Sequence, residues 1–108
     1  YIVPMHTVIQ IPAFADWLHA IKDRSVQVRL MKRLRRAQLG NLGDVKQVGN
    51  GVWEMREFFG PGWRMYYVQR GELLIVMLGG GDKSTQSADI AKATTLASLL
   101  EIEHEQED

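Results

Sequence analysis

The chain has 108 residues, 45% of them hydrophobic and 24% charged, which is the size and composition of one globular domain and excludes a disordered tail or a fibre. It contains no cysteine, which excludes disulfides, thiolate zinc sites and cysteine nucleophiles and favours a reducing, cytoplasmic location. The formal net charge is zero, but residues 1–100 carry 13 basic and 8 acidic residues, a net charge of +5, because the other acids are Glu101, Glu103, Glu105, Glu107 and Asp108.

The first half of the chain predicts one strand and two helices. Alternating side chains over Met5 to Gln10 are typical of a short strand, which Pro12 ends. Apolar residues at helical spacing predict a first helix over Pro12 to Asp23 and a second over Ser25 to Leu39. Gly40 lies just past the second helix, where glycine commonly ends helices.

The second half of the chain predicts an antiparallel meander and a third helix. The expected strands are Val45 to Val48, Val52 to Phe59, Trp63 to Gln69 and Glu72 to Leu78. The last strand is apolar throughout, so we place it centrally in the sheet with both of its faces covered; it is far too short for the roughly 18 residues of a membrane span. The third helix starts near Ser84, and the acidic tail 101–108 is expected to fray beyond it. These elements predict one α+β domain over residues 1–108, with its helices on one face of the sheet.

The hairpin formed by residues 52–69 divides into an apolar face and a polar face, because side chains alternate along a strand. If Gly60 to Gly62 is a three-residue loop, Arg56 pairs with Tyr66. The apolar face, which must pack against helices, carries Trp53, Met55, Phe59, Trp63, Met65 and Tyr67, with Glu57 as a misfit. The polar face, which is expected to be open, carries Glu54, Arg56, Arg64 and Tyr66.

The next turn extends the polar face toward the third helix. With Arg70-Gly71 as a two-residue turn, Arg64 pairs with Met77, and Lys83 then lies at the same end of the sheet as Arg64. Arginine binds phosphate bidentately, and tyrosine can stack on a base or hold a proton, so the pattern favours a site for a phosphate backbone. Each residue also has a simpler explanation, such as an ion pair between Arg56 and Glu54.

Other patterns are less specific. Seven basic residues between Lys22 and Arg36 indicate either a surface for polyanions or a solvated helix face. The stretch Gly81-Asp82-Lys83-Ser84 lacks the glycine that a nucleotide-binding P-loop needs before its lysine, and Asp82 or Ser84 can instead cap the helix. Three histidines are scattered without the spacing of a metal site, so no metal or other cofactor is expected: His6, His19 and His104.

Several motifs occur in order along residues 5–100: Phe14-x-x-Trp17-Leu18, Gly40-Asn41-Leu42-Gly43-Asp44-x-Lys46, Glu54-x-Arg56, Gly60-Pro61-Gly62-Trp63-Arg64-x-Tyr66-Tyr67 and Gly80-Gly81-Asp82-Lys83-Ser84-x-Gln86-x-x-Asp89-Ile90-x-x-Ala93. Together they resemble the RelE/ParE toxin superfamily and, more narrowly, its HigB-like, phage-derived addiction module killer branch. The resemblance implies the RelE-like (microbial ribonuclease-like) fold, an antiparallel sheet with two N-terminal helices and one C-terminal helix.

The resemblance also implies a function: the toxin of a type II toxin–antitoxin system, a metal-independent endoribonuclease that cleaves mRNA on the ribosome and inhibits translation. Its implied partners are mRNA, ribosomal RNA and a cognate antitoxin, expected to be a helix-turn-helix DNA-binding protein. Arg64 matches the family arginine at the scissile phosphate, Lys83 the basic residue after the last strand, and Arg56 and Lys46 basic positions on earlier strands. Within this interpretation, Glu54 or Tyr66 accepts a proton. The expected contacts to RNA phosphates are Lys46, Arg29, Lys32, Arg33 and Arg36.

One departure from the family pattern leaves the acid and base open. Gln86-Ser87-Ala88-Asp89 stands where RelE-type enzymes often have a catalytic tyrosine or histidine, so Asp89, Tyr66 and Glu54 are alternatives. Two other functions also remain open: a non-enzymatic, ParE-like toxin that poisons DNA gyrase, and a non-toxic binding or regulatory module.

Overall fold

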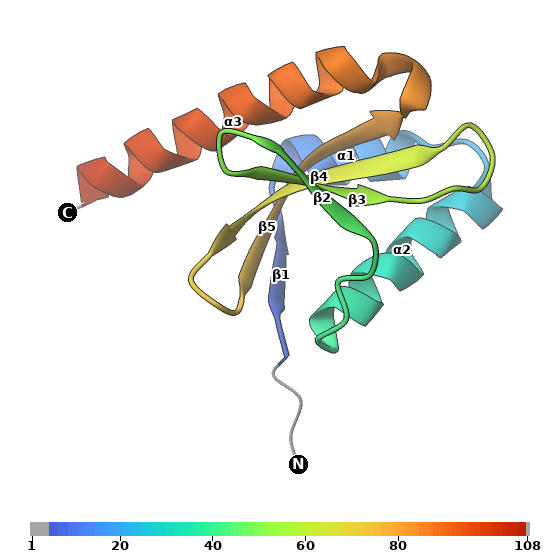
Figure 1. Ribbon diagram of the computed structural model, residues 1–108, viewed down its shortest axis with the longest axis horizontal. Coiled ribbons are helices and arrows are strands. Elements are labelled where there is room, and N and C mark those ends of the chain that lie inside the picture. Colours follow the sequence, from blue (N-terminus) through green and yellow to red (C-terminus); the bar gives the residue numbers. More distant parts are fainter. Residues whose placement is uncertain (1–4, 108) are drawn as a thin grey trace.

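The computed structural model describes the backbone of residues 5–107 and the side chains of residues 5–101 (Figure 1). Within this range the elements are β1 (Thr7–Gln10), α1 (Pro12–Ala20), α2 (Arg24–Gln38), β2 (Val45–Gly49), β3 (Val52–Arg56), β4 (Trp63–Arg70), β5 (Leu74–Asp82), the short 3₁₀ helix η1 (Lys83–Thr85) and α3 (Gln86–Glu107). The α+β class is confirmed, with two helices before the meander and one after it. No helix of the described residues is long and apolar enough to cross a membrane.

The five strands form one mixed sheet in the order β1-β5-β4-β3-β2. Strands β2 to β5 are an antiparallel meander, as predicted, but β1 runs parallel to β5 from Thr7, opposite Leu74, to Gln10, opposite Met77. This parallel pair arises because the chain passes through α1 and α2 before it returns to the sheet. Strand β5 therefore has a neighbour on each side, which confirms its central position.

The helices cover both faces of the sheet, so the prediction that they share one face is wrong. The first core, beneath α1 and α2, contains Phe14, Leu18, Leu30, Leu34, Ala37, Met55, Met65, Tyr67, Ile75 and Met77. The second core, beneath α3, contains Val52, Tyr66, Val68, Val76, Leu78, Ala93 and Ala97. Two layers of helix are required because β4 and β5 carry apolar side chains on both of their faces.

Helix α3 is longer than predicted. It begins at Gln86 and continues to Glu107, where the sequence predicted a frayed tail from residue 101. Glu101 lies 3.6 Å from the Nη2 atom of Arg70, at the end of β4 that is remote from Arg64. The acidic end of the helix therefore leads away from the Gly60–Gly62 loop (Figure 1).

The registers of the β3–β4 and β4–β5 pairs differ from the predicted ones. Arg56 lies opposite Arg64, and Glu54 opposite Tyr66, which is two residues from the predicted register. An even shift leaves every side chain on its predicted face. Between β4 and β5 the loop is longer than two residues and a bulge follows Tyr66, so Arg64 lies opposite Gly81 and its predicted pairing with Met77 is wrong.

Arg33 is a structural residue, which corrects its placement among the RNA-binding residues. Its side chain is only 4% exposed. The Nη1 atom donates to the carbonyl of Arg56 at 2.9 Å and to Oε1 of Glu57 at 3.0 Å. The Nη2 atom donates to the carbonyls of Leu42 at 2.9 Å and Asp44 at 2.7 Å. Arg33 thus ties α2 to the start of β2 and the end of β3, and it explains why Glu57 interrupts the apolar face.

We expect Arg33→Met to lower the free energy of unfolding by about 3 kcal/mol, because it removes the side-chain donor to the part-buried carbonyls of Leu42 and Arg56 and the close ion-pair partner of Glu57. Urea denaturation of both proteins measures the difference. The matched control is Lys32→Met on the exposed side of the same helix, which is expected to change stability by less than about 0.5 kcal/mol. Equal stabilities for the two variants would contradict the structural role of Arg33.

Candidate active site

Strands β3 and β4 place the predicted polar residues side by side. Arg56 and Arg64 are direct neighbours across the two strands, and Glu54 and Tyr66 form the next such pair on the same face. Lys46 on β2 lies opposite Glu54, so it extends the row to the edge of the sheet, where its side chain is exposed. The structure therefore brings together the four polar residues of the hairpin, as the alternation predicted.

Lys83 joins this group from the end of β5. A Cβ atom built on Gly62, whose φ is +82°, would lie 3.4 Å from the Cβ of Lys83 and 3.6 Å from Nη1 of Arg64. Gly62 therefore occupies the narrow space between the two cationic side chains. The prediction that Lys83 and Arg64 lie at the same end of the sheet is confirmed, although the strand register that led to it is wrong.

The polar face is covered, which corrects the expectation that it is open. Helix α3 lies over it, Glu54 is 1% exposed and Tyr66 is fully buried. Gln86, the first residue of α3, donates a hydrogen bond of 2.7 Å from Nε2 to Oε2 of Glu54. Three buried polar atoms beneath the helix lack a hydrogen-bond partner among the described residues: Glu54 Oε1, Arg64 Nε and Tyr66 OH. Such orphaned atoms are uncommon in a core and mark this face as built for more than packing.

The guanidinium of Arg64 is held by the hairpin itself. Its Nη1 atom donates to the carbonyls of Glu57 at 2.8 Å and Trp63 at 3.0 Å, while Nε lies 3.6 Å from Oε1 of Glu54. Arg56 pairs with Asp44, at 2.9 Å, and not with Glu54. Both guanidinium groups are thus fixed in place by protein oxygens, as preorganised binding of an anion requires.

The hydroxyl of Tyr66 is held in its protonated form. Burial raises the pKa of its hydroxyl well above the usual value of 10.0, and the nearby carboxylates of Glu54 and Asp89 raise it further. The hydroxyl therefore stays protonated at neutral pH and can donate, but cannot accept, a proton. Of the carboxylates beside it, Asp89 accepts a hydrogen bond of 2.5 Å from Oγ1 of Thr85 and lies against the backbone of Gly81.

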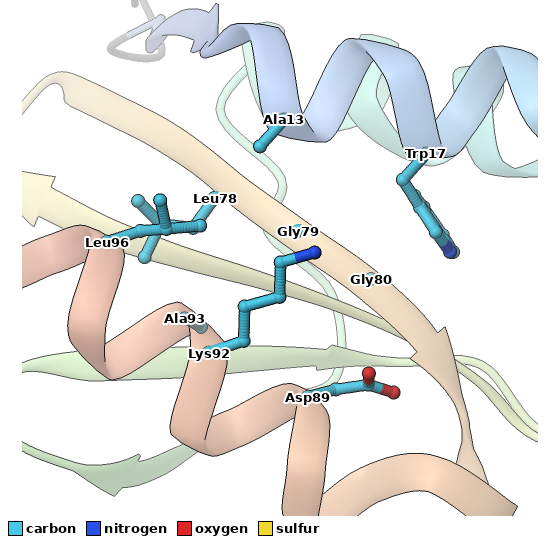
Figure 2. A pocket seen from close by; sticks show the side chains of 9 residues that line it. All are labelled: Ala13, Trp17, Leu78, Gly79, Gly80, Asp89, Lys92, Ala93 and Leu96. Carbon is cyan, nitrogen blue, oxygen red and sulfur yellow. The ribbon is translucent and has the colours of Figure 1, made fainter.

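A pocket of about 160 Å³ adjoins this cluster on the other side of β5 (Figure 2). In Figure 2, Trp17 of α1 and Asp89 and Lys92 of α3 border the backbone of Gly79 and Gly80. A Cβ atom on Gly80 would collide with the ring of Trp17, so glycine at this position allows α1 to approach the strand. The described residues contain no group of three or more side chains suited to hold a metal ion.

The basic surface of α2 is smaller than predicted. Arg29, Lys32 and Arg36 are exposed and, with Arg35 and Glu57, line a shallow hollow, whereas Arg33 points into the protein. The guanidinium of Arg29 lies 3.6 Å from the centre of the Phe59 ring. The β3–β4 loop therefore contacts α2 through Glu57 and Phe59. Sequence analysis gave no role to its remaining aromatic residue, Phe58, although two adjacent aromatics at the base of a hairpin loop indicate that one of them faces solvent.

The sheet order, the helices on both of its faces and the cationic cluster are consistent with the RelE-like fold. Residues 16–100 match the family of phage-derived Gp49-like proteins (DUF891), and the chain belongs to this family, a family of RelE-like toxins of toxin–antitoxin systems. The chain is also 40% identical, over 87 residues, to an uncharacterized protein of Haemophilus influenzae (strain Rd), in an alignment that covers 81% of this chain and 88% of that protein.

The buried tyrosines are expected to make stability fall at high pH. Burial raises the pKa of Tyr67 to about 12, and that of Tyr66 also lies above 10.0, so the unfolded chain loses these protons before the folded chain does. Their contribution is constant below pH 10.0 and is lost as the pH rises above it. Urea denaturation between pH 9 and about 12 is expected to show a shallower decline for Tyr66→Phe than for the wild type. Parallel declines would contradict the raised pKa, since lysine titration is common to both proteins.

Proposed function

We propose that the protein is the toxin of a type II toxin–antitoxin system, of the HigB-like branch, and that it is a metal-independent endoribonuclease that cleaves mRNA on the ribosome in the cytoplasm. The observation that supports this proposal is the meeting of Arg56, Arg64 and Lys83 at one end of the sheet, beside Glu54 and Tyr66. Membership of a family of RelE-like toxins supports the toxin role and a cognate antitoxin as partner.

The proposed chemistry is attack of an RNA 2′-hydroxyl on the adjacent phosphorus. The 2′-oxygen–phosphorus bond forms and the bond from phosphorus to the 5′-oxygen breaks, which gives a 2′,3′-cyclic phosphate and a free 5′-hydroxyl. The pentavalent phosphorane between them carries additional negative charge. In the proposal Arg64 and Lys83 stabilise this charge, and Arg56 positions the backbone. Because three cationic side chains supply the positive charge, the mechanism requires no metal ion.

The burial of the site suggests which residue gives a proton and which accepts one. Tyr66 retains its proton and is suited to protonate the leaving 5′-oxygen, whereas Glu54 is suited to accept the proton of the 2′-hydroxyl. Asp89 is the alternative acceptor, next to Thr85 at the start of α3. Both transfers require the first turn of α3 to move, because the hydrogen bond from Gln86 occupies Glu54 and the helix covers Tyr66. The structure thus corresponds to a closed form of the proposed site.

The proposed RNA path uses the exposed cationic side chains of the predicted set, which excludes the buried Arg33. Arg29, Lys32 and Arg36 on α2 and Lys46 on β2 are free of the buried hydrogen bonds that Arg33 makes, so they can neutralise phosphates of mRNA and ribosomal RNA. The loop of Glu57 and Phe59 lies between the α2 surface and Arg64, so a strand bound at one surface can continue to the other.

The proposal is tested by primer extension on a reporter mRNA after brief induction of the wild type, Lys83→Ala and Arg64→Ala. Cuts within translated codons are expected for the wild type and a reduction of about 100-fold or more for each variant, because each removes a donor that stabilises the phosphorane. Lys83 is exposed, so its variant is expected to fold normally even if Arg64→Ala, which loses two backbone hydrogen bonds, does not.

The matched control is Lys22→Ala, an exposed lysine outside the cluster, which is expected to cleave like the wild type. Intact mRNA together with growth arrest would replace the proposal with target poisoning, as in ParE-like toxins. Intact mRNA with normal growth would leave a binding or regulatory module.

A further inference from the structure

Phe58 is the most exposed large hydrophobic residue in the described part of the chain, with 71% of its surface accessible. It lies in the loop between β3 and β4, directly after the strand that carries Arg56. The other phenylalanine and tryptophan rings of the described residues are buried or half-buried. Phe58 therefore contributes little to the core, and its ring is available to a ligand.

Two guanidinium groups lie near this ring. The Cζ atom of Arg56 lies 5.6 Å, and that of Arg64 5.5 Å, from the ring centre, both within the range of cation–π attraction. Each guanidinium is also anchored elsewhere, Arg56 by Asp44 and Arg64 by the carbonyls of Glu57 and Trp63. The ring is thus positioned by two fixed cations while it stays accessible to solvent.

This combination matches the chemistry of single-stranded nucleic acid. Unpaired bases stack on aromatic side chains, and the neighbouring phosphates bind arginine. A protein partner could also cover an exposed phenylalanine, but two arginines around the ring favour a ligand that alternates flat apolar groups with negative charges. A base in a duplex cannot reach the ring in this way, since its faces are covered by neighbouring bases.

We propose that Phe58 is a platform on which one unpaired RNA base stacks, while Arg56 binds a phosphate beside that nucleotide and Arg64, which is only 5% exposed, binds the next phosphate once the first turn of α3 has moved. The inference rests on the proposed function and adds a residue that favours a single strand over a duplex. The preceding residue, Glu57, fixes the loop through its ion pair with Arg33, so the position of Phe58 depends on the fold and not on the RNA.

The test is binding of a fluorescent, single-stranded 2′-O-methyl oligoribonucleotide, which lacks the attacking hydroxyl and is not cleaved. Phe58→Ala is expected to weaken binding by roughly 5- to 100-fold, the range for loss of one stacked base. Phe58→Trp is expected to retain the affinity, whereas Phe58→Leu, which keeps an apolar side chain without a ring, is expected to lose it.

Salt dependence separates stacking from charge. Phe58→Ala is expected to leave the slope of log affinity against log salt unchanged, whereas Arg56→Ala is expected to reduce it, because only the second variant removes a phosphate contact. The matched control is Leu73→Ala, an exposed apolar residue in the β4–β5 loop at the other end of β4, which is expected to bind like the wild type. Thermal denaturation checks that the Phe58 variants remain as stable as the wild type.

Two outcomes would overturn the inference. The first is that Phe58→Ala binds the oligonucleotide as tightly as the wild type does. The second is that Phe58→Ala loses as much affinity for an oligonucleotide without bases as for the intact one. Unchanged RNA affinity with weakened antitoxin binding would also overturn it and assign Phe58 to a protein interface. Binding that depends on the ring while reporter mRNA stays intact would support the inference and reject the proposed cleavage. If Lys83→Ala loses cleavage while Phe58→Ala both binds and cleaves like the wild type, the proposed cleavage would be supported and the role of Phe58 rejected.

Discussion

The burial of charged and polar groups beneath α3 is the constraint on which the rest of the structure depends. Glu54 and Arg64 lie 3.6 Å apart with the helix above them, and the hydroxyl of Tyr66 has no hydrogen-bond partner among the described residues. Each buried polar atom without a partner costs about 1–3 kcal/mol. The apolar contacts of Ala93 and Ala97 with β3, β4 and β5 offset this cost further along the helix. The first turn of α3 thus covers polar groups, whereas the middle of the helix covers apolar ones.

The alternation of side chains made the composition of both sheet faces predictable. Glu54, Arg56, Arg64 and Tyr66 share a face although the predicted register was two residues off, because alternation has a period of two and an even error preserves it. The position of Lys83 was predictable for a similar reason, since any tight connection between β4 and β5 returns the chain to the same end of the sheet. Most residues of the candidate site could therefore be predicted from local sequence patterns.

Long-range relations could not be read from the sequence. The parallel pair of β1 with β5 depends on contacts between distant segments, which no local pattern encodes. The apolar run of β5 indicates that both of its faces are covered, but not which helix covers which face. Arg33 has the same charge as its exposed neighbours, and only its four carbonyl and carboxylate acceptors, supplied by residues up to Glu57, distinguish it. The exposure of Phe58 depends likewise on how the loop is held, since Phe59 beside it packs against Arg29.

The absence of a tyrosine or histidine at the start of α3 has a chemical consequence. A side chain on that turn would enter and leave the site together with the helix, whereas Glu54 and Tyr66 belong to the sheet and stay in place when α3 moves. Gln86 occupies the position next to Glu54 and can donate hydrogen bonds but cannot exchange a proton at neutral pH. With Glu54 as the acceptor, proton transfer in the proposed reaction depends on the sheet and α3 controls access to it, whereas with the alternative acceptor Asp89 the first turn of α3 takes part in the transfer. In the proposed reaction, opening of α3 exposes Tyr66 to water, which weakens the burial that raises its pKa and makes the hydroxyl a stronger acid when substrate reaches it.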